Sequence, residues 1–143
     1  MAFVYSISIA PERGQFKTPV EKATFIENLG IDGDGHRGDW GRQVTCLNRQ
    51  SVERVNAEKG LQIGPGQYAE NVCISGMEEL DLQVGDRFSL GGDVVLEVTQ
   101  IGKPDHPSVV TIADCVSLLP SEGRFCRVIR GGEVCTGDPV TKL

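Results

Sequence analysis

The most unusual chemistry in this sequence lies between residues 30 and 43. Glycine recurs every two or three residues from Gly30 to Gly38, and His36 and Arg42 stand in or beside this run. A backbone that turns so tightly could bring N–H groups and cationic side chains together around an anion. The same composition is also typical of a solvated loop whose aspartates cap turns. The residues alone leave both interpretations open.

Two further positions combine polar side chains with strand ends. Lys103, Asp105 and His106 follow the strongest strand pattern in the chain, residues 94–101, and two prolines stiffen the backbone around them. Asn71 begins a predicted strand after a Gly-Pro-Gly turn. Its amide could bond a ligand or simply the adjacent turn. These side chains are candidates for binding or for proton transfer.

The five cysteines are odd in number and have no Cys-x-x-Cys spacing, which favours free thiols in a reducing compartment. Cys46 and Cys73 lie in apolar strand runs and are predicted to be buried. Cys126 and Cys135 flank a predicted hairpin, where they would share a face at roughly 7–8 Å, too far for an unstrained disulfide. Cys115 lies in an irregular segment and is the best candidate for a reactive thiol. No His/Cys spacing predicts a structural zinc site.

Length and composition limit the possible classes of protein. A chain of 143 residues with a net charge of −6 predicts a single domain over residues 1–143 and no nucleic-acid partner. No apolar run approaches the roughly 18–20 residues that span a bilayer, so no membrane partner is expected. The first ten residues alternate instead of forming a secretory signal. We therefore expect a cytoplasmic protein.

Short periodic segments dominate the sequence. Residues 3–9 alternate apolar and polar positions, as a half-buried strand does. Asn48 and Gly60 bracket the best helix pattern as N-cap and C-cap. Residues 125–130 and 133–136, separated by two glycines, predict a hairpin. The predicted fold is mainly β, a closed or nearly closed barrel of short strands with one or two short helices.

Several short motifs in this order resemble the MOSC domain, the C-terminal module of molybdenum-cofactor sulfurases. They cover nearly the whole chain, and the resemblance is greatest to small stand-alone bacterial members, which lack the pyridoxal-phosphate-dependent sulfurase domain. The matching motifs are Gly30-Ile31-Asp32-Gly33-Asp34 with His36, Arg42-Gln43-Val44, Gly64-Pro65-Gly66, Glu70-Asn71-Val72, Leu82-Gln83-Val84-Gly85-Asp86, Leu96 to Lys103, Asp114-Cys115-Val116, Pro120, Glu122-Gly123, Phe125, Arg127-Val128, Gly131-Gly132-Glu133-Val134 and Gly137-Asp138.

The resemblance implies a β-barrel like that of pyruvate kinase, with a pocket for the pterin-based molybdenum cofactor (molybdopterin). It alternatively implies a role in carrying sulfur to metal–sulfur centres, with a cysteine desulfurase or a molybdoenzyme as partner. Larger relatives are molybdenum-dependent oxidoreductases. By position, the residues implied to hold the cofactor's phosphate and pterin are His36, Arg42, Asn71 and Lys103.

One departure from the family pattern concerns the chemistry itself. Many relatives carry a Cys-His pair where this chain has Asp105 and His106, and that thiolate is the proposed metal ligand or persulfide carrier. A carboxylate is a hard ligand and cannot hold a transferable sulfur. Either Cys115 replaces the missing thiol, with His106 and Asp105 beside it in a catalytic group, or the domain is a non-catalytic module that binds a small anion or pterin.

Overall fold

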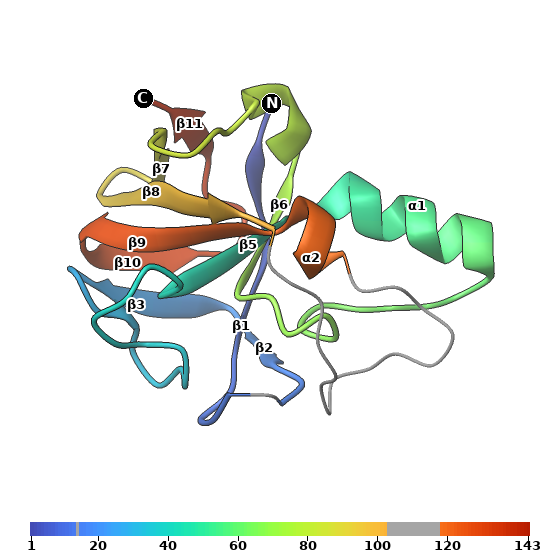
Figure 1. Ribbon diagram of the computed structural model, residues 1–143, viewed down its shortest axis with the longest axis horizontal. Coiled ribbons are helices and arrows are strands. Elements are labelled where there is room, and N and C mark those ends of the chain that lie inside the picture. Colours follow the sequence, from blue (N-terminus) through green and yellow to red (C-terminus); the bar gives the residue numbers. More distant parts are fainter. Residues whose placement is uncertain (14, 103–117) are drawn as a thin grey trace.

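The computed structural model describes residues 1–13, 15–102 and 118–143, which form short strands and few helices (Figure 1). The strands are β1 (Phe3–Ile9), β2 (Thr18–Val20), β3 (Lys22–Ile26), β4 (Gly30–Ile31), β5 (Val44–Asn48), β6 (Val72–Ser75), β7 (Arg87–Leu90), β8 (Val94–Ile101), β9 (Arg124–Arg130), β10 (Gly132–Cys135) and β11 (Val140–Lys142). The helices are α1 (Arg49–Lys59), the 3-10 helix η1 (Met77–Leu80) and α2 (Leu119–Glu122). The prediction of a mainly β fold with short helices is confirmed.

The strands form two sheets that are not closed into a barrel. The larger sheet has the order β11-β7-β8-β9-β5-β6-β1-β2, and the smaller has the order β10-β3-β4. β1 meets β11 only through an isolated bridge between Phe3 and Pro139 and a few flanking backbone hydrogen bonds. The flanking bonds run from the Val4 N–H to the Asp138 carbonyl and from the Val140 N–H to the Ala2 carbonyl, and no ladder longer than this joins β1 to β11 among the described residues. The expectation of a closed barrel is corrected accordingly.

The predicted hairpin between residues 125–130 and 133–136 is wrong. β10 pairs antiparallel with β3 of the smaller sheet, and β9 pairs with β5 and β8 of the larger one. Gly131 makes this crossing possible, since a Cβ there would lie 2.5 Å from the carbonyl oxygen of Phe25. As a result Cys126 faces the core while Cys135 is exposed, and the two thiols do not share a hairpin face.

Helix α1 follows the sequence pattern closely. Asn48 is its N-cap in an extended conformation, and Gly60 is its C-cap in the left-handed region, with φ of 64°. Val52 and Val55 pack against Leu47 and Phe125 on the outer face of the larger sheet. The helix extends to one side of the strands in Figure 1. It therefore packs against β5 and β6.

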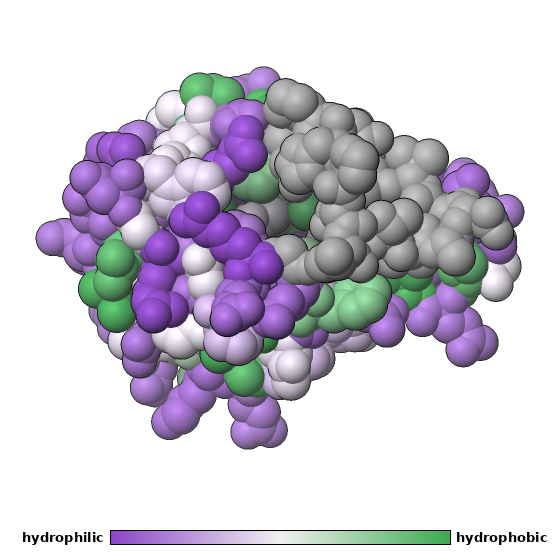
Figure 2. Space-filling view, turned by 60° about the horizontal axis from the view of Figure 1, so that its bottom comes forward, coloured by the Kyte–Doolittle hydropathy of each residue, from purple (hydrophilic) through white to green (hydrophobic). Residues whose placement is uncertain are grey.

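The main core lies between the two sheets and is separate from the cluster under α1. Large apolar side chains that remain exposed are few in the described part of the chain, and the face in Figure 2 shows hydrophilic side chains with separated apolar groups. They are Met1, Phe3, Phe16, Val84 and Leu143. Within the described ranges, no helix is long and apolar enough to cross a membrane.

Candidate functional site

A buried ion pair organises the glycine-rich loop. The side chains of Lys17 and Asp34 are both fully buried, and Lys17 Nζ lies 2.7 Å from Asp34 Oδ1. The backbone N–H groups of Ala10 and His36 donate to the same carboxylate, each at 3.1 Å. Burial alone would raise the pKa of Asp34, but the hydrogen bond and charge of Lys17 and the N–H of Ala10 outweigh it and hold that pKa well below its usual range. Asp34 is therefore ionised and paired.

The same ion pair fixes the proton of His36. Lys17 Nζ lies 3.1 Å from His36 Nδ1, and an ammonium group can only donate. Nδ1 therefore accepts, and the neutral imidazole of His36 carries its proton on Nε2. The ring is 21% exposed and stacks on Trp40, with an interplanar angle of 8°. The guanidinium of Arg13 lies 4.0 Å from the Trp40 ring centroid. His36 thus presents an oriented N–H donor at the surface of the loop.

The turn at residues 64–70 holds the backbone of Lys17 in place. The Lys17 N–H donates to the Gly66 carbonyl at 3.0 Å. The buried carboxylate of Glu70 accepts from the N–H groups of Gly66, at 3.0 Å, and Tyr68, at 3.2 Å. Burial raises the pKa of Glu70, and these hydrogen bonds partly oppose that rise. Lys17, Asp34 and Glu70 therefore form one buried polar cluster beneath the loop.

Arg42 lies apart from this cluster, against the outer face of the larger sheet. Its Nε donates to Gln100 Oε1 at 3.2 Å, and its guanidinium lies 5.3 Å from the Phe125 ring centroid. Arg127 follows Phe125 by two residues along β9 and so shares its face of the sheet. Arg127 Nε is buried without a hydrogen-bond partner in the described ranges. A buried, unsatisfied guanidinium nitrogen calls for an anion or a carbonyl oxygen.

The predicted site residues are only partly brought together. Asn71 is fully buried, its Oδ1 accepts from the Thr45 N–H at 3.0 Å, and its Nδ2 donates to the Ser8 carbonyl at 3.1 Å. Its amide thus joins β5 to β1. Across the described residues, no hydrogen bond or ion pair connects His36, Arg42 and Asn71 with one another. Their role in binding a cofactor stays a prediction.

Four predicted site residues lie outside the described residues: Lys103, Asp105, His106 and Cys115.

Two residues of the candidate site were not predicted from the sequence. Lys17 was missed because it stands in a charged loop without apolar periodicity. Arg127 was missed as well, although an arginine within the apolar run of β9 is a signal that could have found it.

Three of the four described thiols are buried, as predicted for Cys46 and Cys73. Burial raises the pKa of Cys73 to about 12. Burial, together with the neighbouring Cys46, also raises the pKa of Cys126. Since the thiolate is the reactive form, these buried thiols are poorly suited to sulfur chemistry. In the described part of the chain, no group of three or more His, Cys, Asp or Glu side chains is arranged to hold a metal ion.

Comparison with known proteins agrees with this β-rich architecture. The sequence profile of the MOSC domain matches residues 32–141. The chain belongs to the MOSC domain family.

Solved structures show the same fold. The YUAD protein from Bacillus subtilis superposes with a TM-score of 0.75 at 24% identity, over 97% of this chain and 93% of that one. YiiM from Geobacillus stearothermophilus gives a TM-score of 0.75 at 18% identity, over 100% of this chain and 75% of that one.

A protein named "Reductase" from Gibberella moniliformis is 27% identical over 90% of this chain. This chain spans 25% of the length of that relative.

Proposed function

We propose that this domain binds a molybdenum cofactor of the molybdopterin type, and that Arg42 and Arg127 hold its phosphate. Membership of the MOSC family supports the class of ligand. The observation that carries the proposal is the buried Arg127 Nε, which lacks a partner in the described ranges and lies on the sheet face that Arg42 covers. Guanidinium groups match the geometry and charge of phosphate.

The other residues have distinct roles in this proposal. Gln100 and Phe125 restrain Arg42, so little side-chain freedom is lost when it binds an anion. His36 offers its Nε2–H as a directed donor, and Lys103 is assigned by resemblance alone. Asn71 contributes through the fold, because its amide is bonded to backbone on both sides. When bound, the cofactor would supply redox or atom-transfer chemistry at molybdenum, such as that of an oxidoreductase.

The first test measures cofactor content directly. We expect protein purified from a molybdate-fed host to contain molybdenum and pterin in comparable amounts, assayed by elemental analysis and by fluorescence of the oxidised pterin. Arg127→Gln should lower both by about tenfold or more, because a charge-assisted hydrogen bond contributes about 1.5–3 kcal/mol. Arg130→Gln, three positions along β9 at an exposed site, is the matched control and should retain both. Wild-type protein without molybdenum or pterin would contradict the proposal.

A second candidate function is sulfur carriage, with Cys115 as the acceptor. The assignment to Cys115 rests on the sequence, and the burial of Cys46, Cys73 and Cys126 leaves Cys135 as the one exposed competing thiol among those the structure describes. A cysteine desulfurase would pass the outer sulfur of its own persulfide to the Cys115 thiolate. The desulfurase would leave as a thiolate, and Cys115 would become the persulfide.

Peptide mass spectrometry after incubation with a cysteine desulfurase and cysteine tests this second function. We expect one additional sulfur atom on Cys115 and none on the three buried thiols. Cys135→Ser should retain the modification, whereas Cys115→Ser should abolish it. An unmodified Cys115 in the presence of active desulfurase would contradict sulfur carriage and would favour a module that binds without sulfur chemistry.

A further inference from the structure

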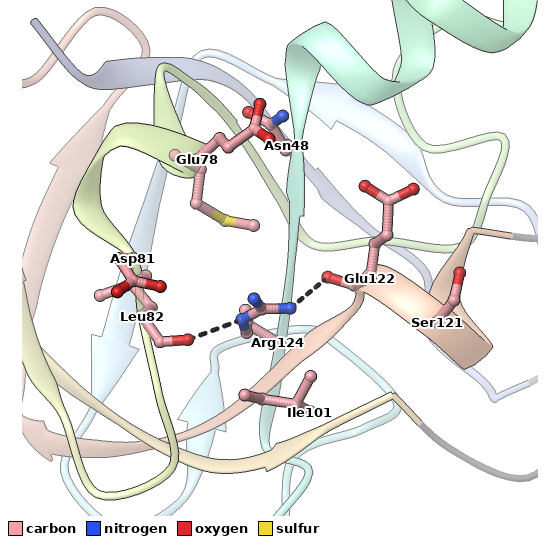
Figure 3. Close-up of a pocket in the computed structure, with 9 residues that line it drawn as sticks. Asn48, Glu78, Asp81, Leu82, Ile101, Ser121, Glu122 and Arg124 are labelled. Atoms are coloured by element: carbon pink, nitrogen blue, oxygen red, sulfur yellow. Dashed lines mark hydrogen bonds between the residues drawn. The ribbon is translucent and has the colours of Figure 1, made fainter.

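A pocket lies apart from the proposed phosphate site. It has a volume of about 290 Å³ and opens between η1, the end of β8, α2 and the start of α1 (Figure 3). No residue of the proposed phosphate site lines it. The lining residues are Asn48, Met77, Glu78, Asp81, Leu82, Ile101, Ser121, Glu122 and Arg124.

One wall of the pocket carries a buried oxygen that needs a donor. Asn48 is 4% exposed, and its Oδ1 has no hydrogen-bond partner among the described residues. The neighbouring contacts fix which amide atom this is. Ser51 Oγ lies 2.6 Å from Glu122 Oε1, so the single hydroxyl proton of Ser51 goes to that carboxylate. Ser51 can then only accept from Asn48, at 3.1 Å, and Asn48 must present Nδ2 to it and Oδ1 to the pocket.

The pocket also contains a fixed cation. Arg124 Nε donates to the Leu82 carbonyl at 2.9 Å, and its Nη1 donates to the Glu122 carbonyl at 3.0 Å. Figure 3 shows this guanidinium in the middle of the lining residues. No described residue accepts a hydrogen bond from the remaining nitrogen, Nη2. Arg124 is therefore held in place with one nitrogen available for a carboxylate.

Acidic and apolar side chains complete the pocket. Glu78 lies beside Asn48 and Asp81 lies beside Leu82 (Figure 3), whereas the Glu122 carboxylate is engaged by Ser51 at 2.6 Å and by Arg54 at 2.8 Å. Met77, Leu82 and Ile101 add apolar surface. A simple anion would be repelled by the carboxylates, and a simple cation would be repelled by Arg124. The pocket matches a ligand that carries both charges.

We propose that this pocket binds a free α-amino acid with an aliphatic side chain. Its ammonium group donates to Asn48 Oδ1 and pairs with Glu78, and its carboxylate pairs with Arg124. The side chain packs on Met77, Leu82 and Ile101. This site does not depend on the cofactor proposal, because it shares no residue with Arg42 and Arg127.

The test is a titration of the full chain, free of molybdenum, with L-leucine, followed by calorimetry and by amide chemical shifts. We expect saturable binding in the millimolar range or tighter, with shift changes at the pocket residues. n-Butylamine has only the ammonium group and isovalerate only the carboxylate. Each should bind at least about tenfold more weakly, because each loses one charge-assisted contact worth about 1.4 kcal/mol or more.

Neighbouring glutamates supply a matched pair of variants. Glu78→Gln should weaken leucine binding by up to about fivefold, the effect of an exposed ion pair, while Glu79→Gln, also exposed but outside the pocket lining, should leave it unchanged. Arg124→Gln, checked for an unchanged unfolding midpoint, should abolish binding. Absence of saturable leucine binding, equal binding of n-butylamine, or equal effects of the two glutamate variants would each overturn the proposal. None of these results depends on cofactor content.

Discussion

Lys17→Met is expected to lower the free energy of unfolding by about 3–5 kcal/mol, measured by urea denaturation at pH 7. The substitution keeps the length and much of the shape of the side chain but removes the charge that pairs with Asp34. Both side chains are fully buried at a separation of 2.7 Å, so solvent screens this pair very little. Asp34 would keep only the backbone donors of Ala10 and His36, and a buried carboxylate would remain without a counter-charge.

Two control variants separate this effect from a general loss of charge. Lys22→Met removes an ion pair with Glu133 at 3.8 Å in which both side chains are more than half exposed, with fractions of 65% and 57%. It should cost less than about 1 kcal/mol. Asp34→Asn in the Lys17→Met background should recover part of the lost stability, because it removes the unpaired charge. If the two lysine variants cost the same, the buried pair does not stabilise the fold.

The pH dependence of the same variants gives an independent check. The pKa of Asp34 is lower in the folded chain than its ordinary value of 3.8, so on acidification the unfolded chain takes up this proton first. Asp34 therefore contributes stability at pH values above its ordinary pKa. This contribution is lost as the pH falls towards the pKa of Asp34 in the folded chain. In Lys17→Met the pairing that lowers the pKa is gone. The stability gap between wild type and variant should narrow between pH 7 and pH 3.

The parts of the fold that sequence reasoning predicted are those that local physics decides. The strand at residues 3–9 follows from alternation, and α1 follows from Asn48, Gly60 and an apolar stripe at helical spacing. The hairpin failed because the partner of β10 is chosen by a distant segment. Gly131 passes against the backbone of Phe25, and no pattern within residues 124–136 reveals that contact.

Sequence reasoning likewise identified some residues of the candidate site and missed others. His36 and Arg42 were singled out because basic side chains within or beside a glycine-rich loop are conspicuous in a sequence, and their role in binding stays a prediction. Lys17 was not found, because its burial depends on Asp34, seventeen positions later, and on the turn at Gly66. A charged residue in a polar loop is usually solvated, and only the folded chain shows that this one is enclosed. Asn71 illustrates the converse, since an amide predicted for a ligand is bonded to backbone.

Gly66→Ala is expected to cost about 2–5 kcal/mol in free energy of unfolding, measured by thermal and urea denaturation. Gly66 has a φ of +80°, a conformation that costs a residue with a side chain about 1–2 kcal/mol. A Cβ there would also lie 2.1 Å from the carbonyl oxygen of Lys17 and 2.8 Å from its carbonyl carbon. The backbone must separate, which disturbs the Lys17 N–H bond to Gly66 and the Gly66 N–H bond to Glu70.

Gly60→Ala isolates the conformational part of this cost. Gly60 has a φ of +64°, but a Cβ there would meet nothing within 4 Å. Its substitution should cost only the left-handed penalty of about 1–2 kcal/mol. The excess for Gly66→Ala then measures how rigidly the segment that carries Lys17 is held against the turn. Equal costs would mean that this segment moves away freely, and a Lys17 that moves freely could not keep Asp34 ionised or fix the proton on His36.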